Sequence, residues 1–393
     1  MRGAKLDETN EPLRGSTSII VGGVVYASIR QIEVFGIEMP LVGSFTSGGV
    51  TKAVTKCVIV RIMDDEGCVG ISSIDPSTRA KSPHTAPEQA RTLRDLVVPQ
   101  LKGLRTNNLA AITHRVREIS PAQPGVAAAV ELAVADLIAH RRGISMLDFL
   151  GGGARERVRF NGWIGELSPD EAAKEAAVWV ARGFCSAKVK VGSGVEEDHD
   201  RIAAVRAQVG TDFELRMDAN EQYSLNDALA LERAVREYDV ALFEQPVNRR
   251  DLDGLAELRR LGTTPIMADE SVVDHESLIR IIRADCADLV KFGIEQVGGL
   301  VRASQMLATA RAAALPVVLG HGFGLDLSTM AEILLGATCD NVVDGLECVG
   351  PLKVSDSVVT KPLDLSSGHL EISNSIGLGL ELDETKLAQY QAF

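Results

Sequence analysis

The chain has 393 residues, of which 24% are charged and 45% are hydrophobic, and its formal net charge is −13. This length suits two or three domains, or one large barrel with a smaller partner domain. The acidic balance argues against a nucleic-acid-binding surface and against a basic membrane-binding patch. No apolar run approaches the roughly 18 to 20 residues that a membrane span needs. We therefore expect a globular protein that contacts neither nucleic acid nor membrane.

The start of the chain and the cysteines bear on the cellular location. Acidic and basic residues balance before the apolar stretch SIIVGGVVYA at 18–27, so the positive charge that precedes a signal-peptide core is lacking. We expect residues 1–27 to form an N-terminal extension. The six cysteines show no CxxC pair and no metal-ligand spacing, which is typical of reduced thiols. These observations predict a cytoplasmic protein.

Residues 28–145 alternate strands and helices irregularly, which is the pattern of an α+β domain. Runs of alternating apolar residues predict strands at 29–41 and 54–64. The stretch PLVGSFTSGGVTKA at 40–53 is small and hydroxyl-rich, and we expect a mobile loop there. Apolar residues at helical spacing predict three helices, at 86–103, 108–119 and 125–143.

From residue 146 the pattern becomes regular, with a short apolar strand and an amphipathic helix repeating about every 25 residues. Eight such alternations predict a parallel sheet closed into a (β/α)₈ barrel over residues 146–367. The last strand–helix unit has the weakest pattern. Residues 368–393 break the rhythm and are expected to return to the first domain. The eight predicted strands are 158–164, 186–192, 213–219, 240–246, 265–271, 287–293, 316–322 and 342–348.

Polar residues recur at the carboxyl ends of these strands, where the active sites of such barrels lie. Each of these polar residues, taken alone, could have a purely structural role instead of a catalytic one. A carboxylate at a strand end often caps the next helix, Lys291 could reach solvent, and a single histidine such as His321 is more often a packed core residue. In strand order the candidates are Lys188, Lys190, Asp218, Asn220, Glu244, Asp269, Glu270, Lys291, His321 and Glu347.

Three of the carboxylates form a pattern that the alternatives do not explain. Asp218, Glu244 and Asp269 end three consecutive strands, so they converge on one side of the barrel mouth. Converging carboxylates repel one another unless a cation neutralises them. Oxygen ligands with open positions suit a hard divalent ion, and we expect Mg²⁺, with Mn²⁺ as the alternative.

The two lysines of the segment AKVKVG flank this predicted ion. Lys188 and Lys190 are two residues apart in a strand, so both project from the same face. A closed barrel has no edge strand on which such a pair could be a solvated surface feature. A lysine must be neutral to accept a proton, and nearby positive charge lowers its pKa. Lys188 and a divalent ion would supply that charge to Lys190, while Lys291 flanks the ion from the opposite side.

From about residue 28 onward, the chain resembles the enolase superfamily, in its muconate lactonizing enzyme subgroup. The strand ends KVK, DAN, EQP and ADES follow the family's order and spacing. The phrase ELAVADLIAHRRGISMLDFLGG at 131–152 resembles the family's entry into its barrel. The resemblance implies that residues 28–145 form a capping domain, that the loop at 40–53 closes over the substrate, and that the protein forms homo-oligomers.

The resemblance also implies a chemistry. Mg²⁺ held by Asp218, Glu244 and Asp269 would bind the carboxylate of a small-molecule substrate, a lysine would remove the α-proton, and the metal would stabilise the resulting enediolate. Lys190 and Lys291 would serve the two faces of the substrate, and Lys188 would help to hold its carboxylate. Supporting or substrate-binding roles would fall to Asn220, Glu270, His321 and Glu347.

The strand ends also indicate the subgroup and the reaction. Lys291 stands where the mandelate racemase pattern has an Asp paired with a His, so His321 lacks that partner. The segment GLECVGPL at 345–352 resembles muconate cycloisomerases and lacks the Asp-x-Asp motif of dipeptide epimerases, which argues against a dipeptide substrate. We expect racemisation, epimerisation or cycloisomerisation. The alternatives are dehydration of a hydroxylated acid such as a hydroxyproline, or a non-catalytic binding barrel, against which the intact lysines and carboxylates argue.

Overall fold

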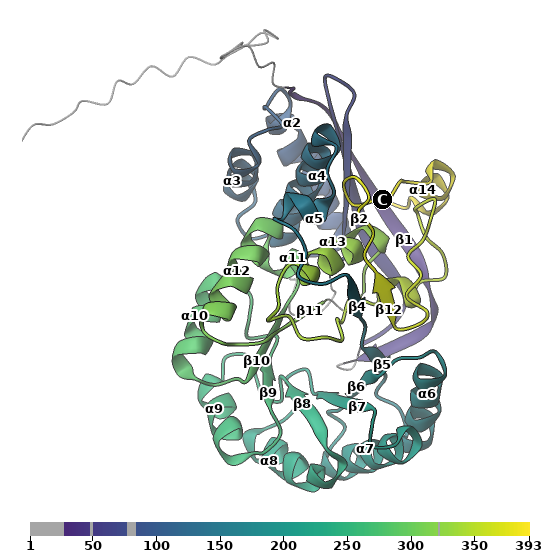
Figure 1. The fold of residues 1–393 in the computed structure, drawn as a ribbon, viewed down its shortest axis with the longest axis vertical. Helices are drawn as coiled ribbons and strands as arrows, with labels where there is room; N and C mark the ends of the chain where they lie inside the picture. The colour runs from purple at the N-terminus through teal and green to yellow at the C-terminus, as the bar shows by residue number, and fades with distance from the viewer. Residues whose placement is uncertain (1–26, 48–49, 77–83, 321–322) are drawn as a thin grey trace, which may run out of the picture.

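The computed structural model describes residues 27–47, 50–76, 84–320 and 323–393. A β-rich cap lies above a parallel barrel in the view of Figure 1, and the last part of the chain returns to the cap. One predicted site residue, His321, lies outside the described residues. None of the helices in the described ranges is both long enough and apolar enough to cross a membrane.

The cap is built on an antiparallel sheet in the order β1–β2–β3. Along β1, Ile37 and Met39 are fully buried while Glu38 between them is partly exposed, which is the alternation of a strand with one covered face. The strands are β1 (Ile29–Ser47), β2 (Val50–Asp64) and β3 (Val69–Ile74).

The prediction of a loop over residues 40–53 is wrong for most of that stretch. β1 and β2 form a hairpin whose paired strands occupy residues 40–47 and 50–53, with a register shift between Pro40 and Phe45, while residues 48–49 lie outside the described residues. The hairpin extends from the cap to the side of strand β5 (Gly162–Ile164) in Figure 1. It also pairs with the barrel, because the N–H of Val42 donates to the carbonyl of Lys353 at 2.8 Å.

A long apolar helix joins the cap to the barrel. Helix α4 (Pro124–Arg142) is buried along nearly its whole length, because it packs on the cap sheet and on barrel helices α11 and α12. It ends at Gly143, whose φ of 64° gives the left-handed cap that glycine adopts without strain. The other cap helices are α1 (Ala86–Thr92), the π-helical turn η1 (Leu93–Val97), α2 (Val98–Leu101) and α3 (Leu109–Ile119).

The barrel contains a parallel sheet in the order β11–β10–β9–β8–β7–β6–β5, so each strand pairs with its neighbour in sequence. Besides β5, its strands are β6 (Ser186–Lys190), β7 (Glu214–Asp218), β8 (Val240–Glu244), β9 (Ile266–Ala268), β10 (Leu289–Phe292) and β11 (Val317–Leu319). The helices around it are α5 (Met146–Phe149), α6 (Pro169–Ala181), α7 (Val195–Val209), α8 (Leu225–Ala234), η2 (Arg236–Tyr238), α9 (Leu252–Leu261), α10 (His275–Ala284), α11 (Ile294–Val297), α12 (Leu300–Ala312), α13 (Asp326–Ala337) and η3 (Gly350–Leu352).

The predicted eighth strand at 342–348 is not a regular strand. A closing segment, residues 341–347, instead joins the two edges of the sheet through isolated bridges. The N–H of Leu346 donates to the carbonyl of Arg159 at 2.8 Å, and the N–H of Glu347 donates to that of Leu319 at 2.9 Å. The segment departs from strand geometry at Gly345, whose φ is 86°.

The predicted first strand at 158–164 is divided, and its first part leaves the barrel. Strand β4 (Arg157–Arg159) pairs antiparallel with β12 (His369–Glu371), which belongs to the C-terminal segment. Beyond β12 the chain returns to the cap, where helix α14 (Glu384–Tyr390) packs against β1. The N–H of Ala392 donates to the carbonyl of Gly36 at 2.8 Å. The end of the chain therefore contacts the start of the cap.

Candidate active site

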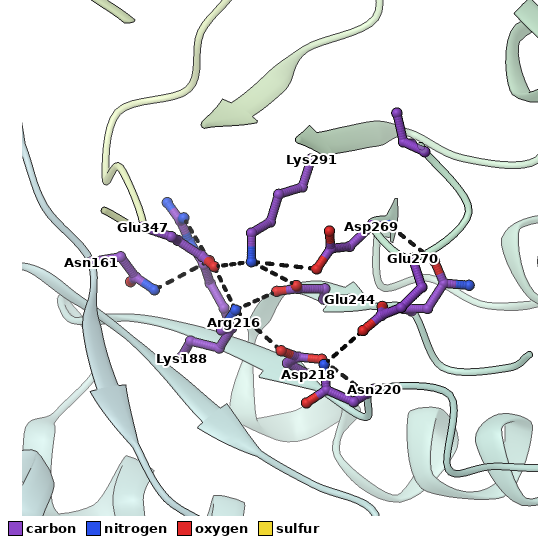
Figure 2. A network of polar contacts seen from close by, with 12 residues as sticks. Asn161, Lys188, Arg216, Asp218, Asn220, Glu244, Asp269, Glu270, Lys291 and Glu347 are labelled. Atoms are coloured by element: carbon purple, nitrogen blue, oxygen red, sulfur yellow. Dashed lines mark hydrogen bonds and ion pairs between the residues drawn. The ribbon is translucent and has the colours of Figure 1, made fainter. Parts of the chain in front are cut away.

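The carboxyl ends of the barrel strands bring the predicted charged residues together, as Figure 2 shows. In the strand register, Lys190 of β6 is level with Asp218 of β7, which is level with Glu244 of β8. Lys188, Lys190 and Lys291 are only 5–6% exposed. Charges that lie in such a water-poor interior interact strongly with one another.

Two lysines bridge the three carboxylates that the sequence predicts as metal ligands. Lys188 Nζ lies 3.1 Å from Asp218 and 2.8 Å from Glu244. Lys291 Nζ lies 2.9 Å from Glu244 and 3.5 Å from Asp269. Carboxylate and ammonium groups therefore alternate across the barrel mouth, from Asp218 to Asp269 (Figure 2).

The lysines keep their protons in this arrangement. Burial lowers the pKa of Lys188, but the charges of Glu244 and Glu347 outweigh burial and raise it above the ordinary lysine value. Burial also lowers the pKa of Lys291, but the charges of Asp269 and Glu244 outweigh burial and raise this pKa well above its ordinary value. Both ammonium groups thus neutralise carboxylates that would otherwise repel one another.

The carboxylate cluster has the donor chemistry of a divalent-cation site. Across the described ranges, no three His, Cys, Asp or Glu side chains are already spaced as a metal-binding group, and ammonium groups lie between the carboxylates instead. Burial and the charge of Asp218 raise the pKa of Glu244 to about 8, although Lys188 and Lys291 lower it. Three convergent carboxylates supply the oxygen ligands that fit a hard cation.

Glu347 of the closing segment connects two of the lysines. Its Oε2 accepts from Lys188 at 2.5 Å and lies 2.6 Å from Lys291 Nζ. Its Oε1 accepts from Asn161 at 3.5 Å and lies 3.6 Å from the guanidinium of Arg216. Burial raises the pKa of Glu347, but these cations together hold it well below the ordinary range. The ionised Glu347 therefore fixes the distance between the two ammonium groups.

Lys190 has a separate set of contacts. Its ammonium group pairs with Asp218 and donates to Asn220 Oδ1 at 2.6 Å. Asn220 Nδ2 donates in turn to Glu270 Oε1 at 3.0 Å. The backbone at Asn220 and Gln245 is left-handed, with φ of 43° and 33°, and strained residues of this kind concentrate at functional sites.

Two residues of this network, Asn161 and Arg216, are not among the candidates that the sequence patterns indicate. Arg216 is fully buried beneath Asp218, and its guanidinium donates to the carbonyls of Asp344 at 2.8 Å and Gly345 at 2.9 Å. The signal that identifies Lys188 and Lys190 also applies to it, because Arg216 and Asp218 are two residues apart in an apolar strand. For Asn161 the comparable signal is weak, because a single amide in a short strand is common.

Comparisons with known proteins identify the family to which the chain belongs. Residues 31–151 match the family model "Mandelate racemase / muconate lactonizing enzyme, N-terminal domain", and residues 171–386 match "Enolase C-terminal domain-like". The hydrophobic dipeptide epimerase of Enterococcus faecalis is 30% identical over 90% of this chain and 99% of its own. Muconate cycloisomerase 1-1 of Acinetobacter lwoffii is 28% identical over 92% of this chain and 96% of its own.

A solved structure extends the likeness to the whole architecture. The crystal structure of the dipeptide epimerase from Enterococcus faecalis, complexed with Mg and the dipeptide L-Leu-L-Tyr, superposes with a TM-score of 0.86 at 28% identity. The match covers 90% of this chain and 99% of that chain. The family models together span both the cap and the barrel. This chain belongs to the mandelate racemase/muconate lactonizing enzyme family of the enolase superfamily, and it is an enzyme of the isomerase type found among these relatives.

Proposed function

We propose that the enzyme is a Mg²⁺-dependent isomerase that removes and returns the proton α to the carboxylate of a small substrate. The observation that carries this proposal is the pair of lysines at the barrel mouth. Lys190 lies on β6 and Lys291 on β10, on opposite sides of the cluster formed by Asp218, Glu244 and Asp269. Two proton carriers on opposite faces of one carbon are what a reaction that inverts that carbon requires.

The three clustered carboxylates would hold the metal ion. The raised pKa of Glu244 supports this assignment, because burial and the charge of Asp218 disfavour its ionised form, which a divalent cation would favour. The Mg in the related epimerase structure supports the choice of ion. When bound, Mg²⁺ would offset the negative charge that develops on the substrate carboxylate during proton removal.

The lysines would carry the proton and position the substrate. If Asp218, Glu244 and Asp269 hold the metal ion, they would no longer stabilise the charged lysines. The neutral amine of Lys190 would then accept the α-proton on one face of the substrate, and the ammonium of Lys291 would return a proton on the other face. Lys188 would donate to the substrate carboxylate. Glu347 would hold Lys188 and Lys291 in place, and the contact of Lys190 with Asn220 would orient its amine.

Deuterium exchange by single lysine variants tests this function. With Mg²⁺ and D₂O, Lys190→Ala should stop exchange of the α-proton for one stereoisomer of a substrate, and Lys291→Ala should stop it for the other. Losing a general base costs about 10²–10⁴-fold in rate. The matched control is Lys56→Ala, which removes a half-exposed lysine of the cap that pairs with Glu38.

The outcomes separate this proposal from its rivals. Near wild-type exchange in both lysine variants would contradict the assignment of the bases. A product lighter than the substrate by one water would show dehydration instead of isomerisation. Loss of exchange for only one isomer in only one variant would indicate a one-base reaction such as cycloisomerisation.

A further inference from the structure

A buried ion pair lies on helix α7, which follows the strand that carries Lys190. Asp198 and Arg201 are both fully buried, and the guanidinium of Arg201 donates to Asp198 Oδ1. The two residues are three apart in sequence, so they share one face of the helix. A buried ion pair is costly unless further hydrogen bonds satisfy its remaining donors and acceptors. The other contacts of this pair therefore show which parts of the chain it holds.

The guanidinium of Arg201 joins the ends of strands β5 and β6. It donates to the carbonyl of Leu167, which follows β5, and at 3.3 Å to the carbonyl of Lys190, the last residue of β6. The register of the ladder between these strands ends at Val189, one residue before Lys190. On the other side, Lys190 is level with Asp218 of β7. Arg201 therefore holds the β5 side of Lys190, beyond the point where that register ends.

The carboxylate of Asp198 holds the turn that follows Lys190. Its Oδ2 accepts from the backbone N–H groups of Gly192 at 2.7 Å, Ser193 at 3.0 Å and Gly194 at 3.3 Å. Gly192 and Gly194 have φ of 135° and 130°, a backbone conformation that glycine adopts without a steric cost. Three successive amides thus converge on one oxygen, which fixes the direction in which the chain leaves β6.

Tyr223 connects Asp198 to the next strand of the barrel. It lies in the loop after β7, and its hydroxyl donates to Asp198 Oδ2. Its ring contacts that of Phe243 on β8 edge to face, with centroids 6.3 Å apart. The same loop carries Asn220, which accepts from the ammonium group of Lys190 at 2.6 Å. The turn after Lys190 and the loop that contacts its ammonium group therefore share one buried carboxylate.

We propose that Asp198, Arg201 and Tyr223, here called the Asp198 cluster, are positioning residues that align Lys190 with the α-carbon of the substrate. Lys291 lies on β10, where its ammonium group contacts a different set of side chains. The cluster therefore serves one face of the substrate. Displacement of a reacting group by about 1 Å can cost about 10²-fold in rate. The inference rests on the proposed function, because it takes Lys190 to be the base on that face.

Conservative variants of the cluster test the inference. Tyr223→Phe removes the hydroxyl and keeps the ring, while Asp198→Asn removes the charge and keeps the shape. The probes are small carboxylates supplied as separate enantiomers, such as the two forms of N-acetylalanine, with Mg²⁺ in D₂O. For the enantiomer whose α-proton exchange Lys190→Ala stops, both variants should lower kcat by about 10–100-fold. KM for that enantiomer should change little, and exchange of the other enantiomer should stay near wild type.

Chemical labelling reports the position of Lys190 without a substrate. Acetic anhydride acetylates a lysine when its amine becomes accessible, and mass spectrometry measures the extent at each lysine. In both variants the labelling of Lys190 should rise about 10-fold, because its local contacts open more often. The labelling of Lys291 should stay unchanged. Lys56, a half-exposed lysine of the cap, is the internal reference.

The matched control is a second tyrosine whose hydroxyl contacts the same helix. Tyr238 lies just before β8, at the end of the barrel opposite the site, and its hydroxyl is 3.3 Å from Nε2 of His199 on α7. Tyr238→Phe should change neither the exchange of either enantiomer nor the labelling of Lys190. Urea denaturation measures the stability of each variant separately. If Asp198→Asn does not fold because a buried charge has lost its partner, Tyr223→Phe decides alone.

Each outcome decides the inference. A loss confined to one enantiomer, with labelling raised at Lys190 and not at Lys291, would support it. Equal losses for both enantiomers, or equal rises in labelling at both lysines, would overturn it and assign the cluster a general role in stability. Wild-type exchange and labelling in a folded Tyr223→Phe enzyme would also overturn it. If wild-type enzyme exchanges no probe, the proposed function fails, and labelling still decides whether the cluster positions Lys190.

Discussion

Glu244 is the residue on which the charge balance of the site depends, because it contacts both Lys188 and Lys291 and lies between the other two carboxylates. Glu244→Gln removes one negative ligand while keeping the side-chain shape. We expect Mg²⁺ affinity to fall at least about 10-fold and exchange activity to disappear. Burial and the charge of Asp218 raise the pKa of Glu244, so its ionised form is unfavourable in the fold. Replacing it by a neutral glutamine should therefore leave the folded structure intact. Calorimetry with Mg²⁺ and far-ultraviolet circular dichroism measure the two effects.

A matched control separates loss of function from loss of a buried carboxylate in general. Glu232 of α8 is also fully buried, and it accepts from the backbone N–H groups of Thr263 and Thr264 before β9, at the end of the barrel opposite the site. Glu232→Gln should lower stability and leave Mg²⁺ affinity unchanged. A Glu244→Gln enzyme that stays fully active without metal would refute the metal assignment.

At the residue scale, alternation along strands predicted most of the charged cluster. Residues two apart in a strand face the same way, so the positions of Lys188, Lys190 and Asp218 followed from the sequence. The same rule applied to Arg216 would have identified it. The contact of Phe45 with Trp163 was beyond such a rule, because it depends on how the cap docks on the barrel.

At the scale of elements, the β1–β2 hairpin is expected to respond to substrate. Its strand pairing and the contact of Phe45 with Trp163 hold it at the mouth, where closure would exclude water from the reacting carbon. Backbone amides at 40–47 should gain protection from hydrogen exchange when a carboxylate substrate binds. Phe45→Ala should reduce that gain and raise KM about 10-fold.

The control for the hairpin lies on the same strand. Val42 is 61% exposed, so Val42→Ala should alter neither protection nor KM. Unchanged protection of the wild-type hairpin on substrate binding would contradict a role in closure. Equal effects of the Phe45 and Val42 variants would assign the change to the hairpin backbone and not to the ring contacts of Phe45.

Element types were more predictable than element boundaries. Seven barrel strands and their helices followed from apolar periodicity, because each strand–helix unit is local in sequence. The prediction of a regular eighth strand is wrong, because the backbone turns at Gly345 and the guanidinium of Arg216 donates to the carbonyls of Asp344 and Gly345 in place of a ladder. The small and hydroxyl-rich residues at 40–53 predict a loop, whereas pairs such as Phe45 with Lys52, and the contact of Val42 with the barrel, make strands of the described residues there.

At the scale of the whole molecule, Asp136 joins three parts of the fold. It lies in α4, accepts from the N–H of Ile71 in β3 at 2.9 Å, and accepts from the N–H of Leu378 in the C-terminal segment at 2.7 Å. Burial raises the pKa of Asp136 to about 6. Between about pH 4 and 6 the folded chain keeps a proton that the unfolded chain has released.

The free energy of unfolding should therefore decrease as pH rises through this window, by up to about 1.4 kcal/mol per pH unit. Asp136→Asn removes the titration. The stability difference between wild type and Asp136→Asn should shrink by about 2 kcal/mol from pH 4.5 to pH 7. Urea denaturation at a series of pH values measures it, and a difference that does not vary with pH would contradict the assignment.

Two whole-molecule expectations stay predictions. One is the division of the chain into an extension at 1–27, a cap at 28–145, a barrel at 146–367 and a C-terminal segment at 368–393. Assembly into homo-oligomers in the cytoplasm is the other. Partial proteolysis would test the division, light scattering the assembly, and cell fractionation the location.

The closing segment of the barrel has a consequence for the order in which the protein assembles. It joins Leu346 to Arg159, residues that are far apart in the chain, whereas the ladders of the parallel sheet pair strands that are successive in the chain. Bringing distant parts of a chain together costs more entropy than pairing neighbours, and such contacts form slowly. A refolding molecule would thus regain its helices before the closing segment completes the barrel. The closing segment also carries Glu347, the carboxylate that contacts both Lys188 and Lys291. Because these lysines are not held in place before the segment docks, enzyme activity would return later than secondary structure.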